Sequence, residues 1–224
     1  VDTDQFPLID VTVSGGNLPA PINSLPATIT VDGTPIAIAA DDTVQRGIQL
    51  ALVVDTNQLV TRNDAGQSAF IELTGTLLDL VDANVFVRNR DWLAAYHIQG
   101  ANEPQLVQPW TQEPNQLFNG IVSKRPAEIS DAPLAGEALI SIMSQMNEQA
   151  ENANLSKVLL LFSAGADLAD LTPILEATQQ DAVAVHVVEL LAGAAHAPSA
   201  TLQTLATASG GHYTALTDPE MSTE

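Results

Sequence analysis

From about residue 46 onward, apolar runs of strand length alternate with segments of helical periodicity. Of all the features of the sequence, this alternation restricts the possible folds most strongly. The run from Ile48 to Val54 is almost continuously apolar, which is typical of a strand covered on both faces of a sheet. Residues 64–83 predict a helix, with Asp64 and Gln67 as a capping box. Its apolar stripe consists of Phe70, Leu73, Leu77 and Leu80. Strands separated by helices imply right-handed crossovers, so the pattern predicts an α/β fold with a doubly wound, mostly parallel sheet flanked by helices.

The same patterns predict the remaining elements of this domain. Strands are expected at 91–98, 157–162, 182–188 and 212–216, and helices at 133–150, about 171–180 and about 199–208. A polar excursion over 99–116, interrupted by prolines, follows the second strand, and a short helix is expected around Leu117 and Ile121. Asp170 is expected to cap the helix that follows it, and the last helix should stop at Gly210-Gly211.

Residues 1–45 have a different pattern, with short runs of period-two alternation. Asp32-Gly33 between two apolar runs is a strong hairpin signal. Strands this short bury little on their own, so they should pack on the next domain or extend a neighbouring sheet. The predicted organisation is an N-terminal β appendage at 1–45, an α/β domain at 46–217 and a tail at 218–224.

The charge balance is strongly acidic. Asp and Glu number 27 against 7 Lys and Arg, a formal net charge of −20, and no Lys or Arg follows Lys157. Such a surface repels phosphate backbones and anionic lipids, which argues against nucleic-acid binding. Solubility is the simplest reason for the excess, although basic partners, divalent cations or a high-salt surrounding are also compatible with it.

Two further absences narrow the class of protein. The chain has no Cys, which excludes disulfides, thiolate metal sites and thiol catalysis. No apolar run reaches the roughly 18 residues of a membrane span, so direct membrane insertion within this chain is not expected. The sequence begins with Val1 and not with Met, which suggests a processed or trimmed N-terminus.

Several segments, taken in order, resemble one family with this layout. They are the apolar strand and acid of Ala51–Leu59, the passage Val85–Asp91, the strand and turn of Leu159–Gly165, and the ending Ser209–Tyr213. Together they resemble von Willebrand factor A domains over roughly residues 46–217. The leading segment, which ends at Val31–Pro35, is similar to the short β unit that precedes this domain in many bacterial secreted members.

The resemblance implies a metal-ion-dependent adhesion site at the carboxyl ends of the strands, where ligands sit in open α/β sheets. The family supplies an Asp and two Ser from a first loop, a Thr from a second and an Asp from a third. Asp55 matches the first carboxylate. Asn57 stands at the first Ser position, where its amide oxygen could coordinate, and Leu59 stands at the second and cannot.

The second and third loops have also lost their ligands. The Thr position falls on or next to Ala132, and Ser130 and Asp131 offer oxygens slightly out of register. The last Asp position falls on Ala164, preceded by Ser163. A hard cation needs several oxygen ligands, so no metal or other cofactor is expected, with Mg²⁺ or Ca²⁺ as a weak alternative at the vestigial positions. Asp55 would then be a strand-end acid that accepts backbone N–H bonds from the following turn.

No catalytic residue is predicted, because the four His form no ligand-spaced cluster and no nucleophile elbow, P-loop or dinucleotide fingerprint is present. Trp110 lies among polar residues and is the better surface candidate of the two Trp. The favoured hypothesis is a non-catalytic interaction or adhesion module of a bacterial surface or secreted protein, located outside the cell, in the periplasm or at the surface. The candidate partner-binding residues are Asp55, Asn57, Ser130, Asp131, Ser163 and Trp110.

Two alternatives stay open. The domain could be a structural packing module within an oligomer or a larger assembly, which a large apolar patch on a sheet edge or on the β appendage would favour. It could also be an α/β hydrolase-type enzyme, which a deep pocket with perturbed acids or an acid–His pair would favour.

Overall fold

The computed structural model describes residues 29–31, 34–36, 47–56, 69–82, 85–99, 103–124, 134, 136–149, 155–163, 168, 170–191 and 197–217. The chain divides into two compact units, Val1–Gln45 and Arg46–Glu224. In the first unit, β1 (Ile29–Val31) and β2 (Thr34–Ile36) pair antiparallel. The hairpin predicted around Asp32-Gly33 is therefore present.

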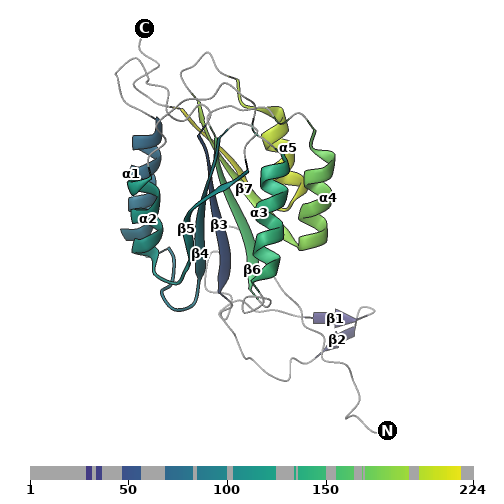
Figure 1. Ribbon diagram of the computed structural model, residues 1–224. Helices are drawn as coiled ribbons and strands as arrows, with labels where there is room; N and C mark the ends of the chain where they lie inside the picture. The colour runs from purple at the N-terminus through teal and green to yellow at the C-terminus, as the bar shows by residue number, and fades with distance from the viewer. Residues whose placement is uncertain are drawn as a thin grey trace. The chain divides into compact units, whose positions relative to one another are not determined.

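A six-stranded sheet forms the centre of the second unit (Figure 1). Its strands are β3 (Ile48–Asp55), β4 (Trp92–Ile98), β5 (Gln105–Thr111), β6 (Ser156–Ser163), β7 (Val183–Leu191) and β8 (Tyr213–Thr217). They lie in the order β5-β4-β3-β6-β7-β8, and every neighbouring pair is parallel except β4 with β5. The strand order reverses between β3 and β6, which confirms the predicted doubly wound, mostly parallel sheet.

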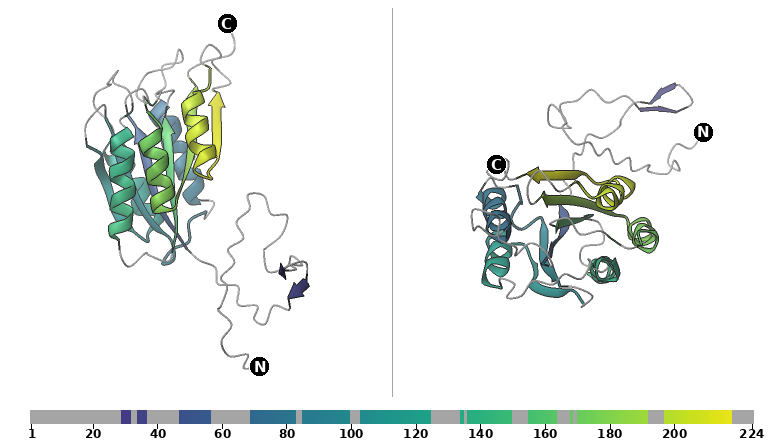
Figure 2. Two further views of the ribbon diagram at one scale, coloured as in Figure 1. Left: turned by 90° about the vertical axis from the view of Figure 1, so that its right-hand side faces the viewer. Right: turned by 90° about the horizontal axis from the view of Figure 1, so that it is seen from above.

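Five described helices cover the two faces of this sheet (Figures 1 and 2). They are α1 (Ala69–Asp82), α2 (Pro114–Ser123), α3 (Gly136–Glu148), α4 (Thr172–Asp181) and α5 (Ala200–Ala208). α1 and α2 lie on one face, and α3, α4 and α5 lie on the other. None of the helices in the described ranges is long and apolar enough to cross a membrane.

Strand alternation divides the core into two clusters. Ala51 and Val53 of β3 point toward α3–α5, whereas Leu52 and Val54 point toward α1 and α2. Both sets are fully buried, as expected for a central parallel strand. The apolar stripes predicted for the helices face these clusters. In α1 the stripe contributes Phe70, Leu73 and Leu77, and in α3 it contributes Leu139, Ile142, Met143 and Met146.

No strand was predicted in the polar excursion over 99–116, but this segment contains β5. Its pattern gave no strand signal because Gln105, Gln108 and Pro109 interrupt the apolar residues. A proline is tolerated in β5 because this strand lies at the sheet edge, where one side of the backbone needs no ladder partner. The β4–β5 pairing also has register shifts between Leu93 and Tyr96.

Several predicted element ends differ from the observed ones. α1 begins at Ala69, and the capping box at Asp64 and Gln67 lies outside the described residues. α4 has Leu171 as its N-cap residue, and Asp170 contributes by accepting the Thr172 N–H at 2.9 Å. α5 begins after Ser199, whose hydroxyl accepts the Leu202 N–H as an N-cap.

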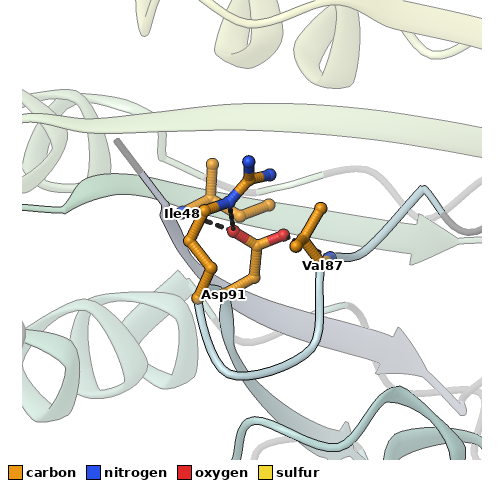
Figure 3. A network of polar contacts seen from close by, with 4 residues as sticks. Ile48, Val87 and Asp91 are labelled. Carbon is orange, nitrogen blue, oxygen red and sulfur yellow. Dashed lines mark hydrogen bonds and ion pairs between the residues drawn. The ribbon is translucent and has the colours of Figure 1, made fainter. Parts of the chain in front are cut away.

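Asp91 joins the starts of β3 and β4 at the amino edge of the sheet (Figure 3). Its buried carboxylate accepts the backbone N–H groups of Val87 at 2.7 Å and Ile48 at 3.1 Å, and the Nε–H of Arg90 at 3.0 Å. The turn before β4 is thereby joined to the first residue of β3. Because both strands start from a common anchor, their carboxyl ends also finish side by side.

Candidate functional site

The site is built on Asp55, the last residue of β3. Its carboxylate accepts a hydrogen bond from the Ser163 hydroxyl at 2.9 Å, and both residues are 0% exposed. Ser163 is the last residue of β6, the parallel neighbour of β3. Two of the residues predicted from sequence, 108 positions apart, are therefore in direct contact at the point where the strand order reverses.

The strand register explains why these side chains meet. Val54 pairs with Phe162, so Asp55 and Ser163 are neighbours one step further along, and Ser163 in turn pairs with Glu189 of β7. All three side chains point to the α3–α5 face, since alternate residues of a strand share a face. Asp55, Ser163 and Glu189 form what we call the carboxyl-edge row. A polar row is compatible with the core here because the strands end at this edge.

Glu189 of the carboxyl-edge row also ties neighbouring elements together. Its carboxylate accepts the backbone N–H of Ser199, the N-cap residue of α5, at 3.0 and 3.3 Å to its two oxygens. The Tyr213 hydroxyl of β8 donates to it as well. Burial, followed by the hydrogen bond and the negative charge of Glu189, raises the pKa of Tyr213 to about 12.

Thr56 determines the exit of the chain from β3. Its backbone N–H and its hydroxyl both donate to the carbonyl of Ile98, at 2.9 and 2.8 Å. Ile98 is the last residue of β4, so the loop after β3 starts from a backbone tied to the neighbouring strand. The carboxyl ends of β3 and β4 are therefore tied to each other at this edge of the sheet.

His97 lies at the same edge of the sheet but on the α1 face. It is buried, and its ring meets the Phe70 ring edge-on with the centroids 6.2 Å apart. Within the described part of the protein its Nε2 has no hydrogen-bond partner. Burial, and then the positive charge of Lys124, lowers the pKa of His97 to about 4. His97 is therefore neutral at pH 7 and is separated by the sheet from the carboxyl-edge row.

The other predicted residues are not all placed beside Asp55. Trp110 lies in β5 next to Thr111, which pairs with Leu93 at the start of β4, so it sits toward the opposite edge of the sheet. It is half-buried and packs against the core on the α3–α5 face. Asn57, Ser130 and Asp131 lie outside the described residues, as do the loop positions Leu59, Ala132 and Ala164.

The chemistry of this site is limited by its burial. Ser163 donates to a carboxylate and has no solvent-exposed surface, so a substrate cannot reach its hydroxyl. Among the residues that the structure describes, no group of three or more His, Asp or Glu side chains could hold a metal ion. Asp55 accepts a hydrogen bond from the Ser163 hydroxyl. The turn after Thr56, whose backbone N–H groups Asp55 was expected to accept, lies outside the described residues.

Sequence comparisons give no assignment: no protein-family model and no curated protein matches this chain. Solved structures do match it. BatB, a conserved hypothetical protein from Bacteroides thetaiotaomicron, is 16% identical with a TM-score of 0.59, over 78% of this chain and 92% of that one. The SpRpn10 VWA domain is 14% identical with a TM-score of 0.57, over 78% of this chain and 90% of that one. A von Willebrand factor type A protein from Catenulispora acidiphila is 12% identical with a TM-score of 0.56, over 78% of this chain and 40% of that one.

This chain has the fold of a von Willebrand factor A domain. The strand order supports this independently, because β3 at the centre of the sheet is flanked by β4 and β6 as a doubly wound VWA fold requires. At such low identities the matches show the fold alone. Asp55 and Ser163 are the last residues of β3 and β6, the adjacent central strands of this fold. The sequence resemblance also assigned them to the ends of two strands.

Sequence reasoning missed two buried polar residues of this VWA fold, Glu189 and His97. The signal for Glu189 was a single acid inside the otherwise apolar run Val187–Leu191, which is the second half of β7. The signal for His97 was an imidazole one residue before the end of β4, in a run of otherwise buried residues. Both patterns also occur at purely structural positions, so the sequence alone gave no reason to select them.

Proposed function

We propose that this chain is a non-catalytic protein-interaction module that binds its partner through the carboxyl edge of the sheet. The observation that carries the proposal is the contact between Asp55 and Ser163 at the strand-order reversal. In open α/β sheets, ligands bind beyond the carboxyl ends of the strands at this point. The loops that follow β3 and β6 leave from these two residues, so their ends lie next to each other above the same edge.

The proposed mode of binding does not depend on a metal. The loop sequences keep few oxygen ligands: Leu59 and Ala164 stand where the resemblance calls for a hydroxyl and a carboxylate. Mg²⁺ requires a nearly octahedral set of oxygens, and Ca²⁺ requires six to eight. Contacts to the partner would then be hydrogen bonds and shape complementarity. The acidic balance of the chain favours a basic partner surface over nucleic acid or anionic lipid.

A melting experiment tests metal independence. The chain is heated with excess Mg²⁺, Mn²⁺ or Ca²⁺ and, as control, with NaCl at matched ionic strength. A ligand that binds only the folded state raises stability by RT ln(1 + [L]/Kd), so a functional site would raise the melting temperature above the salt control. We expect no such difference. A metal-specific rise that Asp55→Asn removes would contradict the proposal.

A pair of charge reversals tests which edge binds. Glu103 is exposed between β4 and β5 at the carboxyl edge, whereas Glu148 is exposed at the end of α3 near the amino edge. Partners would be captured from surface and secreted fractions of the source organism and quantified for each variant. We expect Glu103→Lys to weaken recovery of the specific partner and Glu148→Lys to leave it unchanged. Equal recovery with both variants, or the reverse order, would count against carboxyl-edge binding.

The proposal includes a location outside the cytoplasm, at a bacterial surface, in the periplasm or in the secreted fraction. Its support is the resemblance of the sequence to secreted members of the family. Fractionation of the source organism, followed by immunodetection of this chain, tests it. Recovery only in the cytoplasmic fraction would contradict it.

One observation favours a second candidate, a packing module within an assembly. Apart from Leu216, the large exposed apolar side chains of the described residues lie on α1, α2, β5 and the turn before β4. They are 40–52% exposed and comprise Ile71, Leu78, Val85, Val87, Leu106 and Val122. If they form an assembly surface, sedimentation should show concentration-dependent self-association that Ile71→Lys with Leu78→Lys abolishes. A monomer at all concentrations would contradict self-association through this surface.

A further inference from the structure

His186 and His212 form a pair on adjacent strands, away from the carboxyl-edge row. The backbone N–H of Val187 donates to the His212 carbonyl at 2.9 Å, and Val187 pairs with Tyr213, so His186 and His212 are cross-strand neighbours. Their ring centroids are 5.6 Å apart with the ring planes tilted by 49°. Since Val187 belongs to the core on the α3–α5 face, the alternation of strand side chains directs His186 to the other face.

Solvent reaches this pair. On this face of the sheet the described helices are α1 and α2, and α2 contacts β4 and β5, on the other side of the sheet from β7 and β8 (Figure 2). His212 is exposed and His186 is half-buried. Burial, and then the neighbouring His212, lowers the pKa of His186 below its ordinary value.

The spacing of the rings matches a shared ion. An imidazole nitrogen binds Zn²⁺ at about 2.0–2.1 Å, so two rings on one tetrahedral ion have centres about 5.2 Å apart, or about 5.5 Å with a wider angle at the ion. The observed centroid distance of 5.6 Å lies close to this range. We propose that His186 and His212 form a two-histidine site for a borderline divalent metal such as Ni²⁺, Zn²⁺ or Cu²⁺.

The chemistry of the chain supports this site. Imidazole is a preferred ligand of Zn²⁺, Cu²⁺ and Ni²⁺, whereas Mg²⁺ prefers oxygen. The chain has no Cys, so no thiolate competes for these metals. A net charge of −20 raises the local concentration of cations. Two protein ligands leave coordination positions for water or for a side chain of a binding partner, and the site is independent of Asp55.

Calorimetric titration of the full chain with Ni²⁺ and with Zn²⁺ at pH 7.5 tests the proposal. The wild type is expected to show one strong site. In His186→Ala and in His212→Ala the affinity of this site should fall at least about tenfold. Thr214→Ala, an exposed change in the same strand, should bind as the wild type does. Mg²⁺ serves as the control for nonspecific attraction to the acidic surface and should give no comparable site.

His212 decides the outcome if His186→Ala does not fold, because His212 is exposed and its removal leaves the core intact. Undiminished Ni²⁺ affinity in His212→Ala would overturn the proposal. Absence of Ni²⁺ and Zn²⁺ binding by the wild type at millimolar metal would overturn it as well. Neither result would bear on the carboxyl-edge proposal, which involves other residues on other loops.

Discussion

Buried polar side chains are the individual residues that most affect the behaviour of this domain. Ser163 donates to Asp55, and Glu189 is held by Tyr213 and the backbone of Ser199. His97 differs from them, because its Nε2 has no partner in the described part of the protein. A buried imidazole without a partner strongly disfavours protonation, so His97 should contribute to the response of the protein to acid.

We predict that His97 makes the fold sensitive to acid below pH 6.5. Its pKa is about 4 in the folded protein, against an ordinary value of 6.5. The unfolded chain therefore binds the extra proton between these values, and stability is full above about pH 6.5 and falls as the pH drops toward 4. A difference of this size corresponds to a loss of about 3 kcal/mol. Urea denaturation at several pH values measures it.

The control for this prediction is His97→Gln, which removes the titrating group and keeps a polar side chain. Acidic residues also titrate in this range, so the comparison uses the slope of stability against pH in the variant and the wild type. The variant should have the shallower slope between pH 6.5 and 4. Parallel slopes would show that His97 does not carry the effect.

Among the elements, the junction between α5 and β8 has the tightest backbone packing. Gly210 has a φ of +83°, and the Gly211 N–H donates to the Ala206 carbonyl at 2.8 Å, which ends the helix. A Cβ added to Gly211 would lie 2.0 Å from the carbonyl oxygen of Val185 in β7. The glycine at this position lets the chain pass directly over β7 before it enters β8.

We predict opposite effects for two glycine substitutions. Gly211→Ala should destabilise the protein by about 2 kcal/mol or more, because the Val185 backbone cannot move without disturbing β7. Gly75→Ala should stabilise it by up to about 1 kcal/mol, because Gly75 is exposed within α1 and its Cβ would meet nothing within 4 Å. Chemical denaturation of both variants provides the measurement. A neutral Gly211→Ala would disprove the proposed close contact.

For the protein taken as one body, net charge is the dominant long-range property. A charge of −20 makes the folded state repel itself more than the expanded chain does. Because the repulsion acts between exposed charges, salt screens it, and the Debye length falls from about 30 Å at 0.01 M to about 3 Å at 1 M. We therefore predict that the free energy of unfolding rises with NaCl concentration and levels off near molar salt.

Variants with fewer exposed acids provide the control for the salt prediction. Glu137→Gln and Glu176→Gln lie on exposed positions of α3 and α4. Each should reduce the dependence of stability on salt, with little effect in molar NaCl. Urea denaturation across a salt series decides the question, and a protein that becomes less stable as salt is added would contradict it.

The period of the apolar residues was sufficient to predict the fold class. The apolar runs at 48–54 and 182–188, which were predicted as buried strands, correspond to β3 and β7, and the helical stripes between the predicted strands implied crossovers. The adhesion-site resemblance likewise led to Asp55 and Ser163, since both follow apolar strands that had to be parallel. These features depend on residues close together in the chain, where steric and hydrophobic preferences act locally.

Contacts between segments distant in the sequence could not be predicted from the sequence and were seen only in the tertiary structure. The edge strand β5 was missed because its polar residues and Pro109 are acceptable only once a neighbouring strand supplies one side of its ladder. The His186–His212 pair and the partners of Glu189 depend on strand register, which is set by the packing of the entire sheet. Local patterns indicate which residues must be buried. Which buried residues contact one another depends on strand register and on how the helices pack on the sheet, and both are set by the tertiary structure.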